Sequence, residues 1–206
     1  MSSTQQLDVL RSHPTRELTA DAATLLAAGD ADAALELFNA ALERDQALRP
    51  QLWQRGLALY YAGRFAEGAK QFVSDLTVNG DDAEEVVWAR ACALRAAAAG
   101  TADVARLVDG ARPGGDDRPV MEAVRALFAG GLGPEELLGM PFLGEPTAAA
   151  YAHFYTGLWH ECGAGAGAAD AAGAAGAADA AARSLPLLAK AAAAPSADYM
   201  GQVQPN

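Results

Sequence analysis

A pattern of small and bulky residues recurs in this chain after 34 positions, and this offset constrains the fold more than any other feature. Leucine recurs as leucine and phenylalanine as phenylalanine, so the match does not depend on the abundant alanines. A period of roughly 20 to 50 residues is typical of repeat architectures, in which each unit buries its apolar face against the next. The matching pairs are Leu18 and Leu52, Ala22 and Gly56, Leu25 and Leu59, Gly29 and Gly63, Ala34 and Gly68, Phe38 and Phe72, and Leu42 and Leu76.

Each copy is expected to form two helices joined by a tight turn. Alanine makes up about a quarter of the residues and favours helix over strand. Short breakers separate the apolar segments, which is typical of antiparallel helical hairpins that follow one another along the chain. The sequence predicts helices near residues 17–28, 31–44, 50–62, 65–78, 82–99, 102–110, 117–129, 146–162 and 178–193.

The recurring residues have distinct structural roles in such a hairpin. Ala22 and Gly56 are small enough for the two helices to approach closely. Gly29 and Gly63 are placed to end the first helix and turn the chain. The phenylalanines, four positions after a second small residue, are expected to fill the groove between neighbouring hairpins.

With this period and these residues, the chain resembles the tetratricopeptide repeat (TPR) family over residues 15–82. The resemblance implies an all-α, right-handed superhelix (an α-solenoid) of three to four helical hairpins. The second copy departs from the family pattern at Arg55, where leucine is common, at Asp75, where alanine is common, and at Gly80, where proline is common.

The remaining chain fits the same scheme with more divergence, as one domain over residues 1–206. Residues 1–14 are predicted to be a flexible N-terminus, and 83–145 to be diverged hairpins, in which Gly100 is the turn glycine of the third. Residues 146–206 are predicted to form the last hairpin, with Gly157 in the role of Gly56 and "LPLLAKAAAA" as the returning helix. Its Gly/Ala-rich insert, 163–176, is predicted to be an expanded loop, and Ser196 to cap a closing turn.

Four stretches also resemble a little-characterised TPR-like family of bacteria and photosynthetic eukaryotes. That resemblance brings no activity with it. The stretches are "WQRGLALYYAGRFAEGAKQF", "VNGDDAEEVVW", "YTGLWHE" and "DYMG".

In TPR proteins the first helix of each hairpin lines a concave face that binds peptides or partner helices. The resemblance therefore implies a groove formed by two sets of residues, with an aromatic character that suits an apolar or helical ligand. The alternative interpretation is that these aromatic residues pack against the neighbouring hairpin. The implied groove residues are Arg16, Thr19, Ala23 and Leu26 in the first repeat, and Trp53, Gln54, Leu57, Tyr60 and Tyr61 in the second.

The family's clamp for a partner's C-terminal carboxylate uses Lys, Asn and Arg at groove positions. Ala23, Leu57 and Tyr60 occupy those positions here, so binding of chaperone tails is not expected. The chain is accordingly predicted to be a non-catalytic protein–protein interaction module, a scaffold, adaptor or assembly factor for protein partners. The alternative is a permanent structural subunit of a larger complex.

A second alternative is a metal protein or enzyme that uses His153, His160 and Cys162. The histidines are seven residues apart, whereas a helical chelate normally uses i,i+4 spacing. "WHEC" is not an HExxH motif, and the glycine-rich run lacks the lysine of a phosphate-binding loop. We therefore predict no metal site, no cofactor and no catalytic residues.

The formal net charge of -11 argues against a nucleic-acid partner, because such proteins carry a basic face. Charged residues or glycines interrupt each apolar stretch before it reaches the length of a membrane span, so membrane insertion is not expected. The N-terminal stretch lacks the apolar core of a secretory signal. A cytoplasmic location is predicted, or an organelle such as a plastid if a transit peptide is missing from this chain. Cys92 and Cys162 are predicted to be free, buried thiols.

Overall fold

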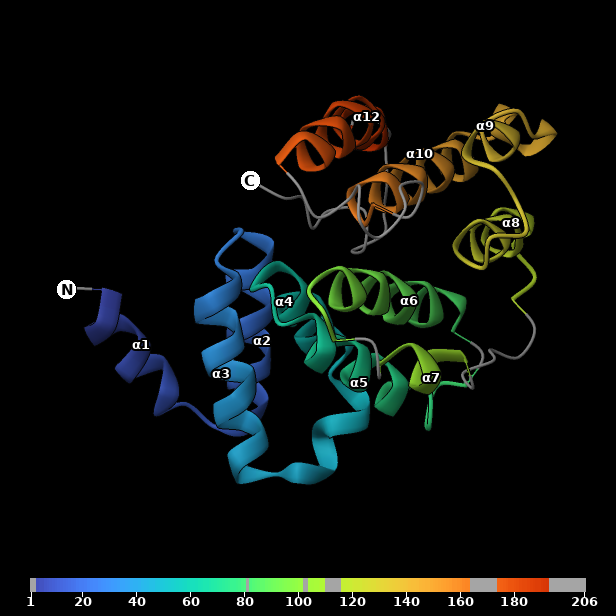
Figure 1. The fold of residues 1–206 in the computed structure, drawn as a ribbon. Helices are drawn as coiled ribbons and strands as arrows, with labels where there is room; N and C mark the ends of the chain where they lie inside the picture. Colours follow the sequence, from blue (N-terminus) through green and yellow to red (C-terminus); the bar gives the residue numbers. More distant parts are fainter. Residues whose placement is uncertain (1–2, 81, 102–103, 110–115, 164–173, 193–206) are drawn as a thin grey trace.

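The computed structural model describes residues 3–80, 82–101, 104–109, 116–163 and 174–192, which fold mainly into helices (Figure 1). These residues contain no β-strand, which confirms the all-α prediction. The helices are α1 (Ser3–Arg11), α2 (Thr15–Ala27), α3 (Ala31–Arg44), η1 (Gln46–Gln51), α4 (Trp53–Tyr61), α5 (Phe65–Asp75), α6 (Ala83–Ala98), α7 (Val104–Asp109), α8 (Pro119–Phe128), α9 (Pro134–Leu137), η2 (Pro141–Gly144), α10 (Pro146–Glu161) and α12 (Ala174–Ala192).

The N-terminal segment contains a helix that the sequence analysis did not predict. Within residues 1–14, for which a flexible segment was expected, Ser3–Arg11 forms α1. Two leucines of α1 pack against the core, and the Arg44 side chain donates to the carbonyls of Arg11 and His13. These contacts anchor the end of α1 to α3.

The second half of the chain also differs in detail from the expectation. The short helices α9 and η2 were not predicted, and each begins with a proline, which suits the first turn of a helix. The Gly/Ala-rich insert was predicted to be a loop over 163–176, but α12 already begins at Ala174. Residues 164–173 and the predicted cap Ser196 lie outside the described residues.

Most of the helices are arranged as successive hairpins (Figure 1). Helix α2 packs against α3, α4 against α5 and α6 against α7, while α3–α4 and α5–α6 contacts join one hairpin to the next. Helix α8 contacts both α6 and α10, and α10 pairs with α12. Residues 185–192 of the expected returning helix "LPLLAKAAAA" lie in α12, and the structure describes no residue beyond 192. This order of elements is consistent with a helical repeat.

The first two hairpins turn in the same way, as the 34-residue offset predicts. Gly29 and Gly63 have φ angles of 85° and 72°, a left-handed conformation that side chains other than glycine rarely adopt. The residue after each glycine donates its amide to the carbonyl five residues before it. The Asp30 amide lies 2.9 Å from the Leu25 carbonyl oxygen, and the Arg64 amide lies 2.8 Å from that of Leu59. This is the Schellman arrangement, which satisfies carbonyls at the end of a helix.

Gly56 allows α4 and α5 to lie in close contact. A Cβ atom at this position would lie 2.6 Å from the ring of Phe72. That ring cannot move aside cheaply, because it is fully buried and stacks on Trp88 with 6.2 Å between centroids. The predicted roles of Gly56 and Phe72 are therefore confirmed.

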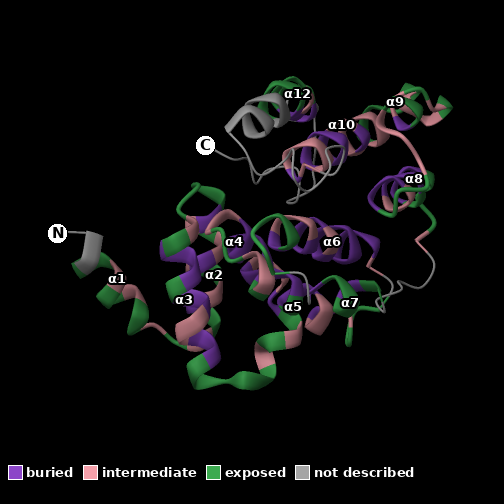
Figure 2. Cartoon of the chain, in the orientation of Figure 1, coloured by how far each residue is buried: buried purple, intermediate pink, exposed green. Residues whose placement is uncertain are grey.

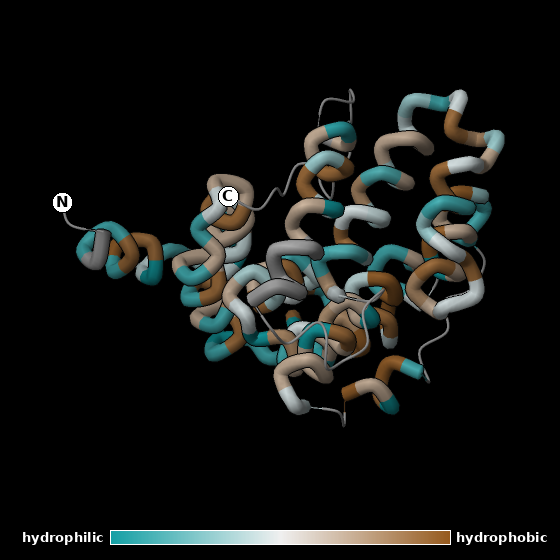
Figure 3. Tube along the Cα trace, turned by 45° about the horizontal axis from the view of Figure 1, so that its top comes forward, coloured by the Kyte–Doolittle hydropathy of each residue, from teal (hydrophilic) through white to brown (hydrophobic). Residues whose placement is uncertain are grey.

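The core runs along the hairpins and is densest at α6, which is buried over most of its length (Figure 2). Apolar and polar residues are interspersed along the helices (Figure 3). This is the pattern of helices with one side toward the core and the other toward the surface. Phe38 and Trp88 are fully buried. Cys92 and Cys162 are free and buried, as predicted.

We expect Gly56→Ala to lower the free energy of unfolding by about 1–3 kcal/mol, because the new methyl group would overpack against the Phe72 ring. Gly144→Ala is the matched control, since nothing lies within 4 Å of a Cβ atom there, and it should change stability by less than about 0.5 kcal/mol. Urea denaturation followed by circular dichroism measures both. Equal stability of the two variants would contradict the close contact.

Candidate functional site

The predicted groove residues lie on α2 and α4, the first helices of the first two hairpins. Arg16 is exposed, and Thr19, whose hydroxyl donates to the Arg16 carbonyl at 2.9 Å, is partly buried. Trp53 and Gln54, at the start of α4, are also partly buried. Since α2 contacts α4, these four residues belong to two adjacent helices.

Leu57 and Tyr60 do not belong to an open groove, which corrects the sequence-based prediction. Leu57 is fully buried, and Tyr60 is 3% exposed. The end of α10 covers Tyr60: the Tyr60 hydroxyl donates to Oε1 of Glu161 at 2.9 Å and lies 3.5 Å from Sγ of Cys162. A partner would have to displace the end of α10 to reach the Tyr60 side chain.

The aromatic residues of this region pack mainly against one another. Tyr60 makes edge-to-face contacts with Tyr61 and with Trp88, at centroid distances of 5.4 and 5.3 Å. Tyr61 also contacts Trp88 at 6.3 Å, and Trp53 packs against the same core from its partly buried position. For Tyr60 and Tyr61 the structure thus favours the alternative interpretation, packing against the next hairpin. Trp53, by contrast, lies at the other end of α4, as its first residue.

A polar cluster joins the ends of α4, α6 and α10; we call Tyr60, Arg95, Glu161 and Cys162 the Glu161 cluster. Arg95 lies over the ring of Phe65 at 4.6 Å and donates to the Glu161 carbonyl at 3.2 Å. Burial raises the pKa of Glu161, and it raises the pKa of the Cys162 thiol to about 12. A thiol with such a pKa is not a nucleophile near neutral pH.

The histidines proposed as alternative metal ligands have other surroundings. Nδ1 of His153 lies 2.6 Å from the carbonyl of Ala149, one helical turn back. His160 contacts the ring of Trp159 edge to face at 5.0 Å. Among the residues that the structure describes, no three His, Cys, Asp or Glu side chains are grouped to hold a metal ion.

Two of the three departures from the repeat pattern, Arg55 and Asp75, belong to one buried network. Arg55 donates through Nε to Oδ1 of Asn39 at 3.0 Å and through Nη1 to Oε1 of Gln71 at 2.9 Å. Gln71 in turn donates to the Asp75 carboxyl at 3.0 Å and to the carbonyl of Arg49 at 2.6 Å. Each side chain of this network forms a hydrogen bond with another member. The network therefore links α3, α4, α5 and η1 through hydrogen bonds within the protein.

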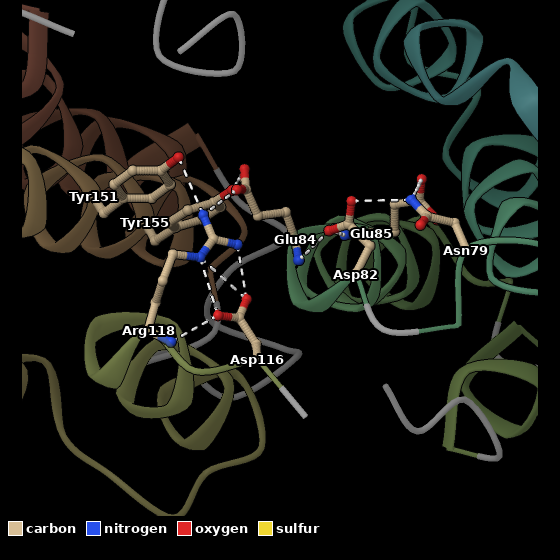
Figure 4. Close-up of polar contacts among 8 residues, drawn as sticks. All are labelled: Asn79, Asp82, Glu84, Glu85, Asp116, Arg118, Tyr151 and Tyr155. Atoms are coloured by element: carbon tan, nitrogen blue, oxygen red, sulfur yellow. Dashed lines mark hydrogen bonds and ion pairs between the residues drawn. The ribbon is translucent and has the colours of Figure 1, made fainter. Parts of the chain in front are cut away.

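A second network joins α6, α8 and α10 around a buried carboxylate (Figure 4). Glu84 accepts from Nη1 of Arg118 at 2.8 Å and from the Tyr155 hydroxyl at 2.9 Å. Arg118 also donates to both oxygens of Asp116 and lies 5.3 Å from the centre of the Tyr151 ring. The hydrogen bonds to Asp116 and then to Glu84 raise the pKa of Arg118, so the guanidinium stays charged. We call these five residues the Glu84 cluster.

Glu85 and Asp75 are the groups whose ionisation is most perturbed near neutral pH. Burial and then the charge of Asp75 raise the pKa of Glu85 to about 8, and burial raises the pKa of Asp75 to about 7. Asn79 donates weakly to Oε1 of Glu85 at 3.5 Å, while Oε2 is buried and has no hydrogen-bond partner within the described part of the chain (Figure 4). A proton on Glu85 is therefore expected at neutral pH.

Sequence reasoning identified part of this region and missed the rest. Asp82 caps α6, accepting from the amides of Glu84 and Glu85, as expected for an acidic residue at a helix start. Two glutamates at a helix start fit the helix dipole, but Glu84 and Glu85 are buried, and Glu84 binds Arg118 and Tyr155, which are distant in sequence. The available signal was their position within the apolar run of α6, whose following residues are Val, Val and Trp.

Comparison of the chain with family models, with curated proteins and with solved structures finds no match. None of the described helices is both long enough and apolar enough to cross a membrane. Inferences about function therefore rest on the residues and contacts described above.

We expect the protein to become less stable as the pH rises from about 5 to about 9. The folded state holds protons on Asp75 and Glu85 up to pKa values of about 7 and about 8, whereas unfolded carboxyls release them near pH 4. Because the folded state binds more protons over this interval, rising pH favours unfolding. Thermal melts at constant ionic strength test this, and Asp75→Asn with Glu85→Gln should flatten the slope. A wild-type stability that rises across the interval would contradict the assignment.

We expect Tyr60→Phe to destabilise the fold by about 1–2 kcal/mol, since the partly buried Glu161 carboxyl would lose the hydrogen bond from the Tyr60 hydroxyl. The control is the same substitution in a Glu161→Ala background, where it should cost clearly less because the acceptor is already absent. Chemical denaturation measures the loss in both backgrounds. An equal loss in the two would argue against the Tyr60–Glu161 hydrogen bond as the tie between α4 and α10.

Proposed function

We propose that this protein is a non-catalytic scaffold or adaptor of the TPR type, a right-handed superhelix of helical hairpins that binds a peptide or helix of a protein partner. The observation that carries the proposal is the repetition itself. The first helices of the hairpins α2–α3 and α4–α5 end in the same way. Gly29 and Gly63, which lie 34 residues apart, both have a positive φ angle there. Such arrays present the first helices of their hairpins on one surface.

The partner surface is proposed to be the part of α2 and α4 that remains accessible: Arg16, Thr19, Trp53 and Gln54. Thr19 and Trp53 occupy equivalent positions in the two repeats. Tryptophan and arginine are the residue types most enriched at the energetic centres of interfaces. Relative to the sequence-based groove, this surface excludes Leu26, Leu57 and Tyr60, which lie in the core. Tyr61 borders it from a partly buried position.

The contacts of the titratable groups support a role without catalysis. The Glu84 and Glu161 clusters use their carboxylates, hydroxyls and guanidiniums to bind one another across helices. The pKa of the Tyr155 hydroxyl is raised well above its ordinary value by burial, so it does not supply a phenolate. General acid–base catalysis needs groups that reach a substrate and titrate near the working pH.

We expect Trp53→Ala combined with Arg16→Glu to remove specific partners from the purified complex. Affinity purification of tagged protein, with quantitative mass spectrometry, should show those partners reduced by at least about tenfold, as for the loss of an interface anchor. The matched control is Glu43→Ala with Lys70→Ala, two exposed residues on the second helices α3 and α5. Partners that persist in the first variant and vanish in the control would place the binding surface on the opposite side. Circular dichroism verifies that both variants remain folded.

A further inference from the structure

The connection between α5 and α6 contains the pair Asn79-Gly80, and no other Asn-Gly pair occurs in the sequence. Both residues are exposed, in the turn that follows Asp75 at the end of α5. In such a pair the backbone nitrogen of the glycine can attack the side-chain amide of the asparagine. Glycine favours this attack because it has no side chain in the way and its backbone reaches many conformations. The pair is therefore a chemically reactive point between the second hairpin and the third.

The structure leaves the attacking nitrogen of Gly80 accessible. The Asn79 amide donates to the Asp75 carbonyl at 3.0 Å, and the Asp82 amide donates to the Asn79 carbonyl at 3.1 Å. Between them, the Gly80 amide forms no hydrogen bond with any residue that the structure describes. The surroundings of Gly80 are also open, since a Cβ atom there would lie no closer than 3.6 Å to the Leu76 carbonyl oxygen.

The Asn79 side chain points toward two carboxyl groups (Figure 4). Its Nδ2 lies 3.3 Å from Oδ2 of Asp82 and 3.5 Å from Oε1 of Glu85. Both distances are longer than those of ordinary N–H···O hydrogen bonds, so the amide is held weakly. The other oxygen of Asp82 accepts from the amides of Glu84 and Glu85 and thereby caps α6. A hydrogen-bond donor at position 79 thus fits surroundings that consist of acceptors.

We propose that Asn79 is a site of spontaneous deamidation, and that the carboxylate formed there weakens the connection between α5 and α6. The Gly80 nitrogen bonds to Cγ of Asn79 and gives up its proton, while the Cγ–Nδ2 bond breaks and the amide nitrogen leaves as ammonia. Water then opens the succinimide ring. The product is an aspartyl residue or an isoaspartyl residue, in which the backbone runs through the former side-chain carbon. This inference is independent of the proposed scaffold function.

Either product replaces a donor by an acceptor at the start of α6. The new carboxylate would repel the Asp82 carboxylate, which caps the helix. It would also cease to donate to Glu85, whose Oε2 is buried and has no hydrogen-bond partner among the described residues. The isoaspartyl form further lengthens the backbone between α5 and α6, whose rings Phe72 and Trp88 stack in the core.

The experiment incubates the full, folded chain at mildly alkaline pH and physiological temperature, and follows the peptide that contains residue 79 by mass spectrometry. Its mass should rise by the difference between an amide and an acid. Asn39, which is followed by Ala40 and accepts from Arg55, is the internal control and should stay unmodified. Gly80→Ala should block the conversion, and alanine fits because Gly80 has no positive φ angle. Conversion at the wild-type rate in Gly80→Ala, or conversion in urea but not in the folded chain, would overturn the proposed site.

A second measurement tests the effect on the fold. Asn79→Asp, which places the product side chain in the chain directly, should lower the Tm by about 2–4 °C. Asn79→Ala is the matched control, because it removes the donor without adding a charge, and its loss should be smaller. A Tm of Asn79→Asp equal to that of the wild type would overturn the weakening of the α5–α6 connection. Neither measurement involves Trp53 or Arg16, so these results leave the scaffold function to its own test.

Discussion

The indole ring of Trp88 holds together elements that the chain order keeps apart. It is fully buried in the middle of α6 and meets aromatic rings from three other helices: Tyr60 on α4, Phe72 on α5 and Phe154 on α10. Aromatic pairs at such distances add to the energy of area burial, and they also fix the relative rotation of the helices. The second hairpin, the third and the last therefore share one core, although nearly a hundred residues separate α4 from α10.

The polar clusters lie where this core meets the helix ends. The Glu84 cluster ties the start of α6 to α8 and α10, and the Glu161 cluster ties its end to α10 and α4. Removing one partner from a buried, hydrogen-bonded group costs more than the bond itself contributes, because the other partner is left unsatisfied. Polar pairs at both ends of α6 therefore penalise any shift of α10 along it, which apolar packing alone would tolerate.

The local part of this fold could be predicted from the sequence because it depends on residues close together in the chain. A glycine that ends a helix, such as Gly63, and a small residue facing a ring, such as Gly56, act within one hairpin, and the 34-residue offset makes them visible twice. The helix over Ser3–Arg11 was missed because its anchor, Arg44, lies in another hairpin.

The errors at the candidate site have the same origin. Tyr60 has the position of a groove residue within its own repeat, but its contacts with Trp88 and with Glu161, 101 residues later, make it part of the core. Glu84 and Glu85 have the charge of surface residues and the position of a helix start, so only the apolar residues that follow them distinguish them from solvent-facing glutamates. Arg55 and Asp75 could be recognised as departures from the repeat, but Gln71, which joins them, matches no rule that would mark it.

The covering of Tyr60 by α10 has a consequence for how a partner could be recognised. In an array with an open concave face, a ligand contacts the first helices of several hairpins at once, and affinity accumulates along the groove. Here the α4 segment of that face is interrupted at its C-terminal end, so the accessible part reduces to the start of α2 and α4, around Thr19 and Trp53. A surface of that extent suits a short segment with one apolar anchor better than a long extended peptide, since most of the binding energy must come from a few residues. Under the proposed function, the repeated hairpins would thus supply the positions of the binding side chains, and the end of α10 over Tyr60 would limit the length of the ligand.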